Sequence, residues 1–318
     1  MTSDRGVGRY APTPSGDLHI GNLRTAVAAW LAAAATDRGF AVRVDDLDEE
    51  RCDEETATRQ LEDLAALGVR SDREVVYQSR RGEAYRAAAE RLAARGLVYE
   101  CYCSRREIRE AQSAPHATPG RYPGTCRNLS ESQRRERRAR LKDQGRAPAL
   151  RLRAQAPSWR IEDRARGSVE RPLDDIVLRR GGQQPGWAYH LAVVVDDAYS
   201  GVDQVVRGAD LLDVSPTQAY LASLLGLPEP SYAHVSLVLD ENGERLAKRS
   251  GAPSARDLAE EGWGPGELLA AIGRSLGRPG AGSLDELAEP FDPSELADPP
   301  VRWPADFVAY GPARGAEG

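Results

Sequence analysis

The residues best suited to chemistry stand near the N-terminus, in residues 9–22. A stretch predicted to be a strand, residues 7–11, enters a turn of prolines and glycines, and an alanine- and leucine-rich helix is predicted to begin just after His19. The N-terminus of a helix after such a loop presents backbone N–H groups to a phosphate. Gly16 and Gly21 let a ligand approach the main chain, and His19 stands where its ring could reach that phosphate. These residues predict a nucleotide phosphate site.

A second candidate is the basic segment of residues 243–250, which follows a predicted strand and a turn. A lysine on a loop can follow the negative charge that builds on a leaving pyrophosphate. Taken alone, the segment is equally typical of a basic surface turn. Together with the first loop it favours phosphate chemistry, with Lys248 acting beside His19.

Three of the four cysteines, Cys101, Cys103 and Cys126, lie within a short span. In a cytoplasmic protein such a cluster indicates a metal rather than disulfides. A structural zinc site is tetrahedral and closed, so it needs a fourth ligand, and on chemical grounds His116 is the candidate. The alternative is three free thiols and no metal.

The elements that must position these residues alternate between strands and helices. The predicted strands are residues 42–44, 75–77, 204–207 and 232–239. The predicted helices are residues 54–67, 80–95, 216–225 and 264–276, with Ser215 expected to cap the third. This alternation implies a parallel sheet with helices on its faces, an α/β fold.

The alternation stops at Tyr99 and resumes at Trp187. We therefore predict an insertion that contains the cysteines, a polar helix at 130–143 and short β-like runs at 149–153, 159–162 and 176–179. The predicted segments are residues 1–99, the first half of the catalytic domain; 100–184, the insertion with an acceptor-like subdomain; 185–252, the second half; and 253–318, a helical C-terminal segment with a tail disordered from Gly311.

Residues 9–21, as Arg-x-Ala-Pro-x-Pro-x-Gly-x-Leu-His-Ile-Gly, resemble the signature of the class I aminoacyl-tRNA synthetases in its glutamyl form. The family's second histidine is replaced by Asn22. Residues 245–249 resemble the family's Lys-Leu-Ser-Lys-Arg loop, with Arg245 for the first lysine and Ala247 for the serine. The resemblance spans roughly residues 6–275. It implies a Rossmann-like catalytic domain that binds ATP through His19, Gly21 and Lys248, with Mg²⁺ bridging the phosphates.

The resemblance also implies the residues that recognise L-glutamate. Two carboxylates need guanidinium groups, and the amine needs an acid or a hydroxyl. The family's acidic residue appears here as Asp45, which is one methylene shorter than the usual glutamate. The implied glutamate-binding residues are Arg9, Thr13, Asp45, Tyr189 and Arg207.

The spacing of Tyr122 and Cys126 repeats the Tyr-x-x-x-Cys pattern of the glutamyl-queuosine group, truncated relatives of glutamyl-tRNA synthetase. This makes Tyr122, rather than His116, the implied fourth ligand of one structural Zn²⁺ per chain. We expect the residues after Ser250 to be too few for a helical anticodon-binding region. The resemblance implies activation of glutamate with ATP in the absence of tRNA, followed by transfer to the queuosine base in the anticodon of tRNA(Asp).

Composition sets the remaining expectations. The net charge of −6 does not by itself predict a nucleic-acid partner, although residues 134–153 are strongly basic. No apolar run reaches the ~20 residues of a membrane span, and the N-terminus lacks a signal-peptide pattern, so we expect a cytoplasmic monomer without a membrane partner. The alternatives are a minimal glutamyl-tRNA synthetase that charges tRNA(Glu), an adenylate-forming enzyme for a small molecule or protein, and a non-catalytic paralogue that binds nucleotide or tRNA.

Overall fold

A computed structural model describes residues 5–112, 121–246, 252–288, 291–297 and 299–307. Its main element is a seven-stranded sheet with the order β3-β2-β1-β9-β10-β6-β7. All neighbouring pairs run parallel except β6 and β7. The strands are β1 (Val7–Tyr10), β2 (Gly39–Val44), β3 (Val76–Tyr77), β6 (Ser158–Asp163), β7 (Gly167–Pro172), β9 (Val202–Gly208) and β10 (Ser231–Val235). The predicted parallel α/β sheet is confirmed.

Two hydrophobic cores lie on the two faces of this sheet, because successive strand residues point in opposite directions. Phe40 and Val42 belong to one core, whereas Ala41 between them belongs to the other. Helix α1 (Ile20–Ala34), with α9 (Pro265–Ser275) and α10 (Leu284–Ala288), covers the first face. Helix α7 (Ser215–Leu225) covers the second and packs on α6 (Tyr189–Tyr199).

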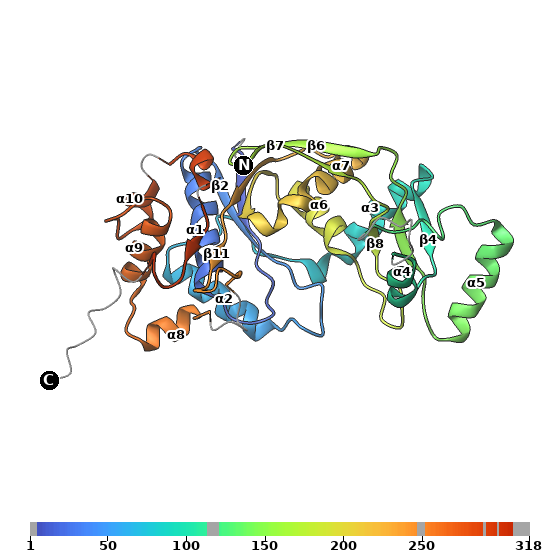
Figure 1. The fold of residues 1–318 in the computed structure, drawn as a ribbon, viewed down its shortest axis with the longest axis horizontal. Helices are drawn as coiled ribbons and strands as arrows, with labels where there is room; N and C mark the ends of the chain where they lie inside the picture. The colour runs from blue at the N-terminus through green and yellow to red at the C-terminus, as the bar shows by residue number, and fades with distance from the viewer. Residues whose placement is uncertain (1–4, 113–120, 247–251, 289–290, 298, 308–318) are drawn as a thin grey trace.

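A smaller antiparallel sheet contains β4 (Val98–Cys101), β5 (Ala149–Leu152) and β8 (Val177–Arg179). Together with α4 (Arg105–Gln112) and α5 (Glu131–Asp143) it forms one end of the elongated molecule, and α8 (Ala255–Glu260), α9 and α10 lie at the other (Figure 1). Between these ends lie α2 (Glu54–Ala66) and α3 (Gly82–Ala94).

Residues 100–184 contribute to both sheets. The hairpin of β6 and β7 runs along one edge of the molecule (Figure 1), and it joins the main sheet where Asp163 pairs with Tyr232 of β10. We predicted the run at 159–162 as part of the insertion, but its side chains pack into the catalytic core through Ile161. Strand β7 was not predicted, because Val169 is its one fully buried residue and the strand lacks an apolar alternation.

Two local predictions are wrong, and a third differs from the structure only at the start of its helix. Val214, not Ser215, is the N-cap of α7, and the Ser215 side chain is fully buried and bonded elsewhere. The run at 232–239 is two strands, β10 and β11 (Val238–Leu239), and β11 pairs with β12 (Val301–Arg302). The helix predicted at 80–95 begins as a 3₁₀ turn, Gln78–Arg81.

No helix among the described residues is long and apolar enough to span a lipid bilayer. His116, Lys248 and the tail from Gly311 lie outside the described residues, so nothing in the structure bears on them.

Candidate active site

A cavity of about 550 Å³ opens at the carboxyl ends of β1, β2 and β9. Ligands of open parallel sheets bind at this edge. Residues of both predicted loops line it, together with Tyr189 of α6. The predicted site residues that it brings together are Arg9, Thr13, His19, Gly21, Asp45, Tyr189 and Arg207.

His19 is the N-cap of α1 and is fixed by a reciprocal pair of hydrogen bonds. Its Nδ1 accepts from the backbone N–H of Gly21 at 3.1 Å, and its own N–H donates to Oδ1 of Asn22 at 3.2 Å. Because Nδ1 is an acceptor here, the neutral ring bears its proton on Nε2. His19 therefore presents a donor at the N-terminus of a helix, where partial positive charge already favours an anion.

Two positions of the loop require glycine, one because of a close contact and the other because of its backbone conformation. A Cβ at Gly21 would lie 3.0 Å from Cε1 of His19, so any larger residue would displace the ring. Gly16 has a φ of 148°, a backbone conformation that residues with a Cβ rarely adopt. Its carbonyl accepts from Nε2 of Gln60 on α2 at 2.6 Å, which ties the loop to that helix.

The chain on either side of the predicted Lys248 loop is anchored beside His19. Before the loop, the N–H of Leu246 donates to the carbonyl of Val238 at 2.9 Å. After it, Ser254 forms an antiparallel bridge with His19, and the N–H of Ala255 donates to the carbonyl of Leu18 at 3.1 Å. The two predicted ATP elements therefore meet at one place.

Arg9 and Arg43 share one buried aspartate from α6. Arg9 contacts Asp197 at 3.2 Å, and Arg43 contacts Asp197 through Nη1 and Asp45 through Nε at 2.6 Å. Burial opposes ionisation of Asp197, but the two arginines outweigh it and hold its pKa below the usual range. Asp45 differs, because burial raises its pKa and the attraction of Arg43 only partly offsets this.

Arg207 is buried, 4% exposed, and its hydrogen bonds within the described part of the chain all go to uncharged groups. Its guanidinium donates to His234 Nε2 at 3.1 Å, to Ser215 Oγ at 2.7 Å and to the Tyr189 hydroxyl at 3.4 Å. Burial lowers the pKa of Arg207, and nearby Arg9 adds to this. A buried cation held by neutral groups needs an anion nearby.

Four residues of this network have no role in the sequence analysis, namely Arg43, Asp163, Asp197 and His234. Ser215 is expected there only as a helix cap. The sequence does indicate a role for Asp197. It belongs to an aspartate pair that ends the apolar run 191–195, and a carboxylate buried in such a setting requires a charged or hydrogen-bonding partner. For Asp163 and His234 no such indication exists, since they meet through the pairing of distant strands.

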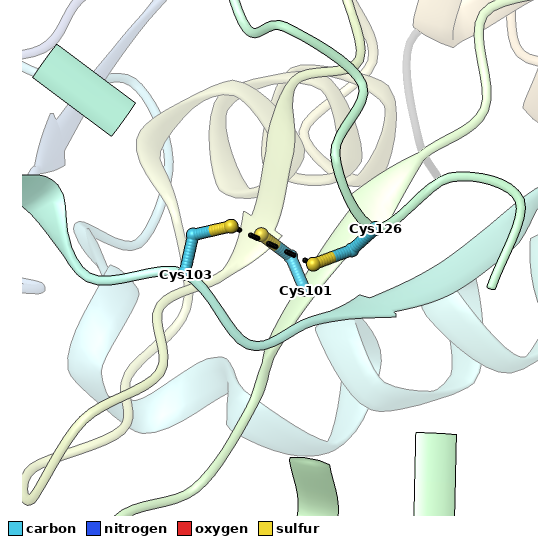
Figure 2. A group of neighbouring side chains, drawn as sticks. All are labelled: Cys101, Cys103 and Cys126. Carbon is cyan, nitrogen blue, oxygen red and sulfur yellow. Dashed lines mark hydrogen bonds between the residues drawn. The ribbon is translucent and has the colours of Figure 1, made fainter. Parts of the chain in front are cut away.

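The three clustered cysteines converge from the end of β4, the loop after it and the turn at Cys126 (Figure 2). Their sulfurs all lie within 4.8 Å of one another, and Cys103 and Cys126 are 3.5 Å apart. Tetrahedral zinc with ~2.3 Å Zn–S bonds places its sulfurs ~3.8 Å apart, so the cluster fits such an ion. The hydroxyl of Tyr122 lies 3.3 Å from Cys101 Sγ and 3.9 Å from Cys103 Sγ. The cluster could hold a metal.

A second cavity, of about 640 Å³, lies between the first cavity and this cluster. Thr13, Asp45 and Tyr189 line both cavities, so the two are neighbours that share a wall. The lining of the second also includes Cys101 and Cys103, an indole and several arginines: Trp187, Arg105, Arg146, Arg151 and Arg180.

Comparison with known proteins places this geometry in a family. Residues 7–287 match the family described as tRNA synthetases class I (E and Q), catalytic domain. A protein of Nocardia farcinica named glutamyl-Q tRNA(Asp) synthetase is 55% identical over 295 residues, 93% of this chain and 92% of the relative. Another of that name, from Cutibacterium acnes, is 46% identical over 90% of this chain and 78% of the relative.

Solved structures support the fold. A crystal structure of a glutamate tRNA ligase from Elizabethkingia meningosepticum superposes with a TM-score of 0.80 at 23% identity, over 95% of this chain and 68% of that one. The chain belongs to the glutamate and glutamine group of the class I tRNA synthetases and, within that group, to the family of the glutamyl-Q tRNA(Asp) synthetases.

Proposed function

We propose that the protein activates L-glutamate with ATP to glutamyl-adenylate in the absence of tRNA, and then transfers the glutamate to the queuosine base in the anticodon of tRNA(Asp). The observation that supports glutamate most directly is Arg207, a buried guanidinium with uncharged partners in the cavity of the phosphate loop. A substrate carboxylate would supply the missing anion.

Glutamate would lie between Tyr189 and three arginines of the cavity, Arg9, Arg43 and Arg207. Arg207 binds one carboxylate, and Arg9 orients the amino acid from the neighbouring strand, while Thr13 and Asp45 face the amine. Both oxygens of Asp45 accept from Arg43, at 2.6 and 3.4 Å. Its shorter side chain is therefore held in place before the substrate arrives.

The adenylation step needs positive charge around the α-phosphorus. The carboxylate of glutamate attacks there in line, and pyrophosphate leaves. The Nε2–H of His19 and the backbone N–H groups at the start of α1 stabilise the added charge. Mg²⁺ bound with ATP would share the charge of the phosphates. Lys248 follows Leu246, which lines the cavity, by two residues, and we assign to it the stabilisation of the leaving pyrophosphate.

The transfer step needs a nucleoside beside the adenylate. The second cavity meets this requirement, because it adjoins the first at Tyr189 and is lined by Trp187 and several arginines. We assign it to the acceptor base and its adjoining phosphates, since aromatic rings stack on bases and arginines pair with phosphates. A hydroxyl of the queuosine cyclopentene ring then attacks the acyl carbon. The ester forms as the bond between the acyl carbon and the phosphate oxygen breaks, AMP leaves, and the hydroxyl proton passes to its phosphate. Because the mixed anhydride is already activated, proximity is sufficient.

We further propose that Cys101, Cys103, Tyr122 and Cys126 hold one structural Zn²⁺. The hydroxyl of Tyr122 also accepts from the N–H of Cys126 at 3.0 Å, so its oxygen faces the cluster. A zinc ion would fasten the irregular segment after β4 to the end of the smaller sheet. It has no part in the reaction.

The test is ATP–pyrophosphate exchange with glutamate and no tRNA. We expect exchange that depends on glutamate, followed by transfer of labelled glutamate to tRNA(Asp) whose 3′ end is blocked. Periodate should abolish the transfer by oxidising the cyclopentene diol. Labelling of tRNA(Glu) at its 3′ end would instead identify a minimal glutamyl-tRNA synthetase, and ATP binding without exchange would identify a non-catalytic paralogue.

A further inference from the structure

Behind the cavity, Arg207 is the first member of a buried chain of three side chains. Its Nε donates to Nε2 of His234 at 3.1 Å, and Nδ1 of His234 lies 2.5 Å from Oδ2 of Asp163. His234 is 0% and Asp163 is 3% exposed, and neither lines the cavity. These two residues act on a ligand only through Arg207.

The protonation of His234 follows from its neighbours. The Nε of an arginine is always a donor, so Nε2 of His234 must accept. The single proton of the neutral ring is therefore on Nδ1 and is donated to Asp163. Burial lowers the pKa of His234, and this outweighs the opposing effect of Asp163, so the ring is neutral.

The strands determine this arrangement. His234 is paired with Arg207 in the register of β10 and β9, and Asp163 is paired with Tyr232 in the register of β6 and β10. Oδ1 of Asp163 accepts from the backbone N–H groups of Ala165 at 3.0 Å and Arg166 at 2.9 Å. Oδ2 is thereby directed at His234.

We propose that Asp163 and His234 are positioning residues for substrate recognition: Asp163 fixes the tautomer of His234, and His234 aims the guanidinium of Arg207 at the carboxylate of the substrate. This inference rests on the proposed function of the cavity as a glutamate site. It assigns a role to β6, the strand between β10 and β7, whose Asp163 acts on the site through His234.

Asp163→Asn tests this series of hydrogen bonds by replacing one carboxylate oxygen with an amide nitrogen. Oδ1 of the asparagine should remain with the two backbone N–H groups, so its amide nitrogen would face Nδ1 of His234. The ring must then place its proton on Nε2, against the N–H of Arg207. We expect the KM for glutamate in pyrophosphate exchange to rise about tenfold or more, which corresponds to ~1.4 kcal/mol, and the KM for ATP to stay within about twofold.

Asp203→Asn is the matched control. Asp203 also accepts a backbone N–H, that of Val7 at 2.8 Å, and pairs with Arg38 at 3.0 Å, but it lies at the amino end of β9. This variant should lower the melting temperature without changing the KM for glutamate. If both variants change KM in proportion to lost stability, Asp163 is only structural.

Two substitutions of His234 separate its two hydrogen bonds. The oxygen of His234→Gln can reach Arg207, whereas the shorter His234→Asn can keep only the contact with Asp163. We expect the glutamine variant to retain more affinity for glutamate than the asparagine variant at similar stability. The reverse order would overturn the proposal.

Nitrogen-15 shifts of labelled histidine report the tautomer directly, and the chain has only 4 histidines. We expect a proton on Nδ1 of His234 in the parent protein and on Nε2 in Asp163→Asn. A proton on Nε2 in the parent, or a changed tautomer with an unchanged KM, would overturn the inference. Absence of exchange in the parent protein would refute the proposed function instead, because the tautomer can be read without any activity.

Discussion

At the scale of single residues, the cavity is organised by sharing of charge. One carboxylate, Asp197, contacts both Arg9 and Arg43, and this fixes two cations of adjacent strands with a single group from α6. Such a bridge is costly to bury and is stable only while it is complete. Removal of its central member leaves two guanidinium groups facing each other.

We expect Asp197→Asn to lower the free energy of unfolding by about 3 kcal/mol at pH 7, the range for breaking a buried ion pair. The two arginines keep the folded-state pKa of Asp197 below its unfolded value of ~3.9. Its contribution is therefore present above pH ~4 and is lost as the pH falls through the lower folded value. Urea unfolding of both proteins from pH 7 to pH 3 measures this. A difference that does not shrink in acid would contradict the ion-pair explanation.

At the scale of elements, the start of α1 shows how a helix can prepare a functional group. His19 is both the cap of the helix and the proposed phosphate ligand, and Asn22 completes the reciprocal bond. The asparagine at the position of the family's second histidine thus has a structural explanation. It orients the remaining histidine.

Asn22→Ala should therefore reduce pyrophosphate exchange severalfold, because the N–H of His19 loses its acceptor and the first turn loses ~1 kcal/mol. Asn22→Asp retains an acceptor oxygen at the same position and serves as the control. Steady-state exchange and thermal unfolding of both variants measure the effect. Equal losses in the two variants would argue against the role of the hydrogen bond.

The smaller sheet provides a second prediction at this scale. Cys103→Ser should lower bound zinc from about one ion per chain. Because a structural metal supports the local fold, amide exchange should speed up in β4 and in residues 121–129, while β1 and β9 stay protected. Mass spectrometry and metal analysis measure both effects, with Cys52→Ser as the control, since Cys52 lies outside the cluster. Stable, metal-free protein would refute the zinc site.

At the scale of the whole molecule, the cavity assembles segments that are distant in the chain. The loop before α1, the strand β9 and the segment after residue 251 meet at one edge of the sheet, between the two ends seen in Figure 1. The contact of His19 with Ser254 and the hydrogen bond from Leu246 to Val238 anchor the described residues on the two sides of the Lys248 loop.

Lys248→Ala should lower glutamate-dependent exchange by about 100-fold, as expected from removing one contact that forms mainly in the transition state. The KM for glutamate and the melting temperature should change little. Arg249→Ala, next in the chain, is the control for loss of positive charge alone. Near-normal exchange by Lys248→Ala would refute the catalytic assignment of this loop.

The sequence predicts those parts of the site that are encoded locally. His19, Gly21 and Arg9 lie in one contiguous motif, and Arg207 follows from the end of a recognisable strand. Asp163 and His234 could not be predicted, because their contact depends on β6 joining β10, and nothing in the short run 158–163 distinguishes a strand of the main sheet from a strand of the insertion. Ser215 was assigned to a cap, since its local setting fits that role equally well.

The uncharged hydrogen-bond partners of Arg207 have a consequence for amino-acid selectivity. Glutamine has almost the shape of glutamate, so a cavity of this size cannot separate the two by volume. The α-carboxylate must attack ATP, so Arg207 binds the side-chain carboxylate. An amide there would bring no negative charge to the buried cation, and its NH2 group would face the N–H groups of the guanidinium. Exchange driven by glutamine should therefore stay near background in the parent protein, and competition assays should give an inhibition constant far above the KM for glutamate. The choice between the two amino acids is then electrostatic, and it is made before any tRNA is bound.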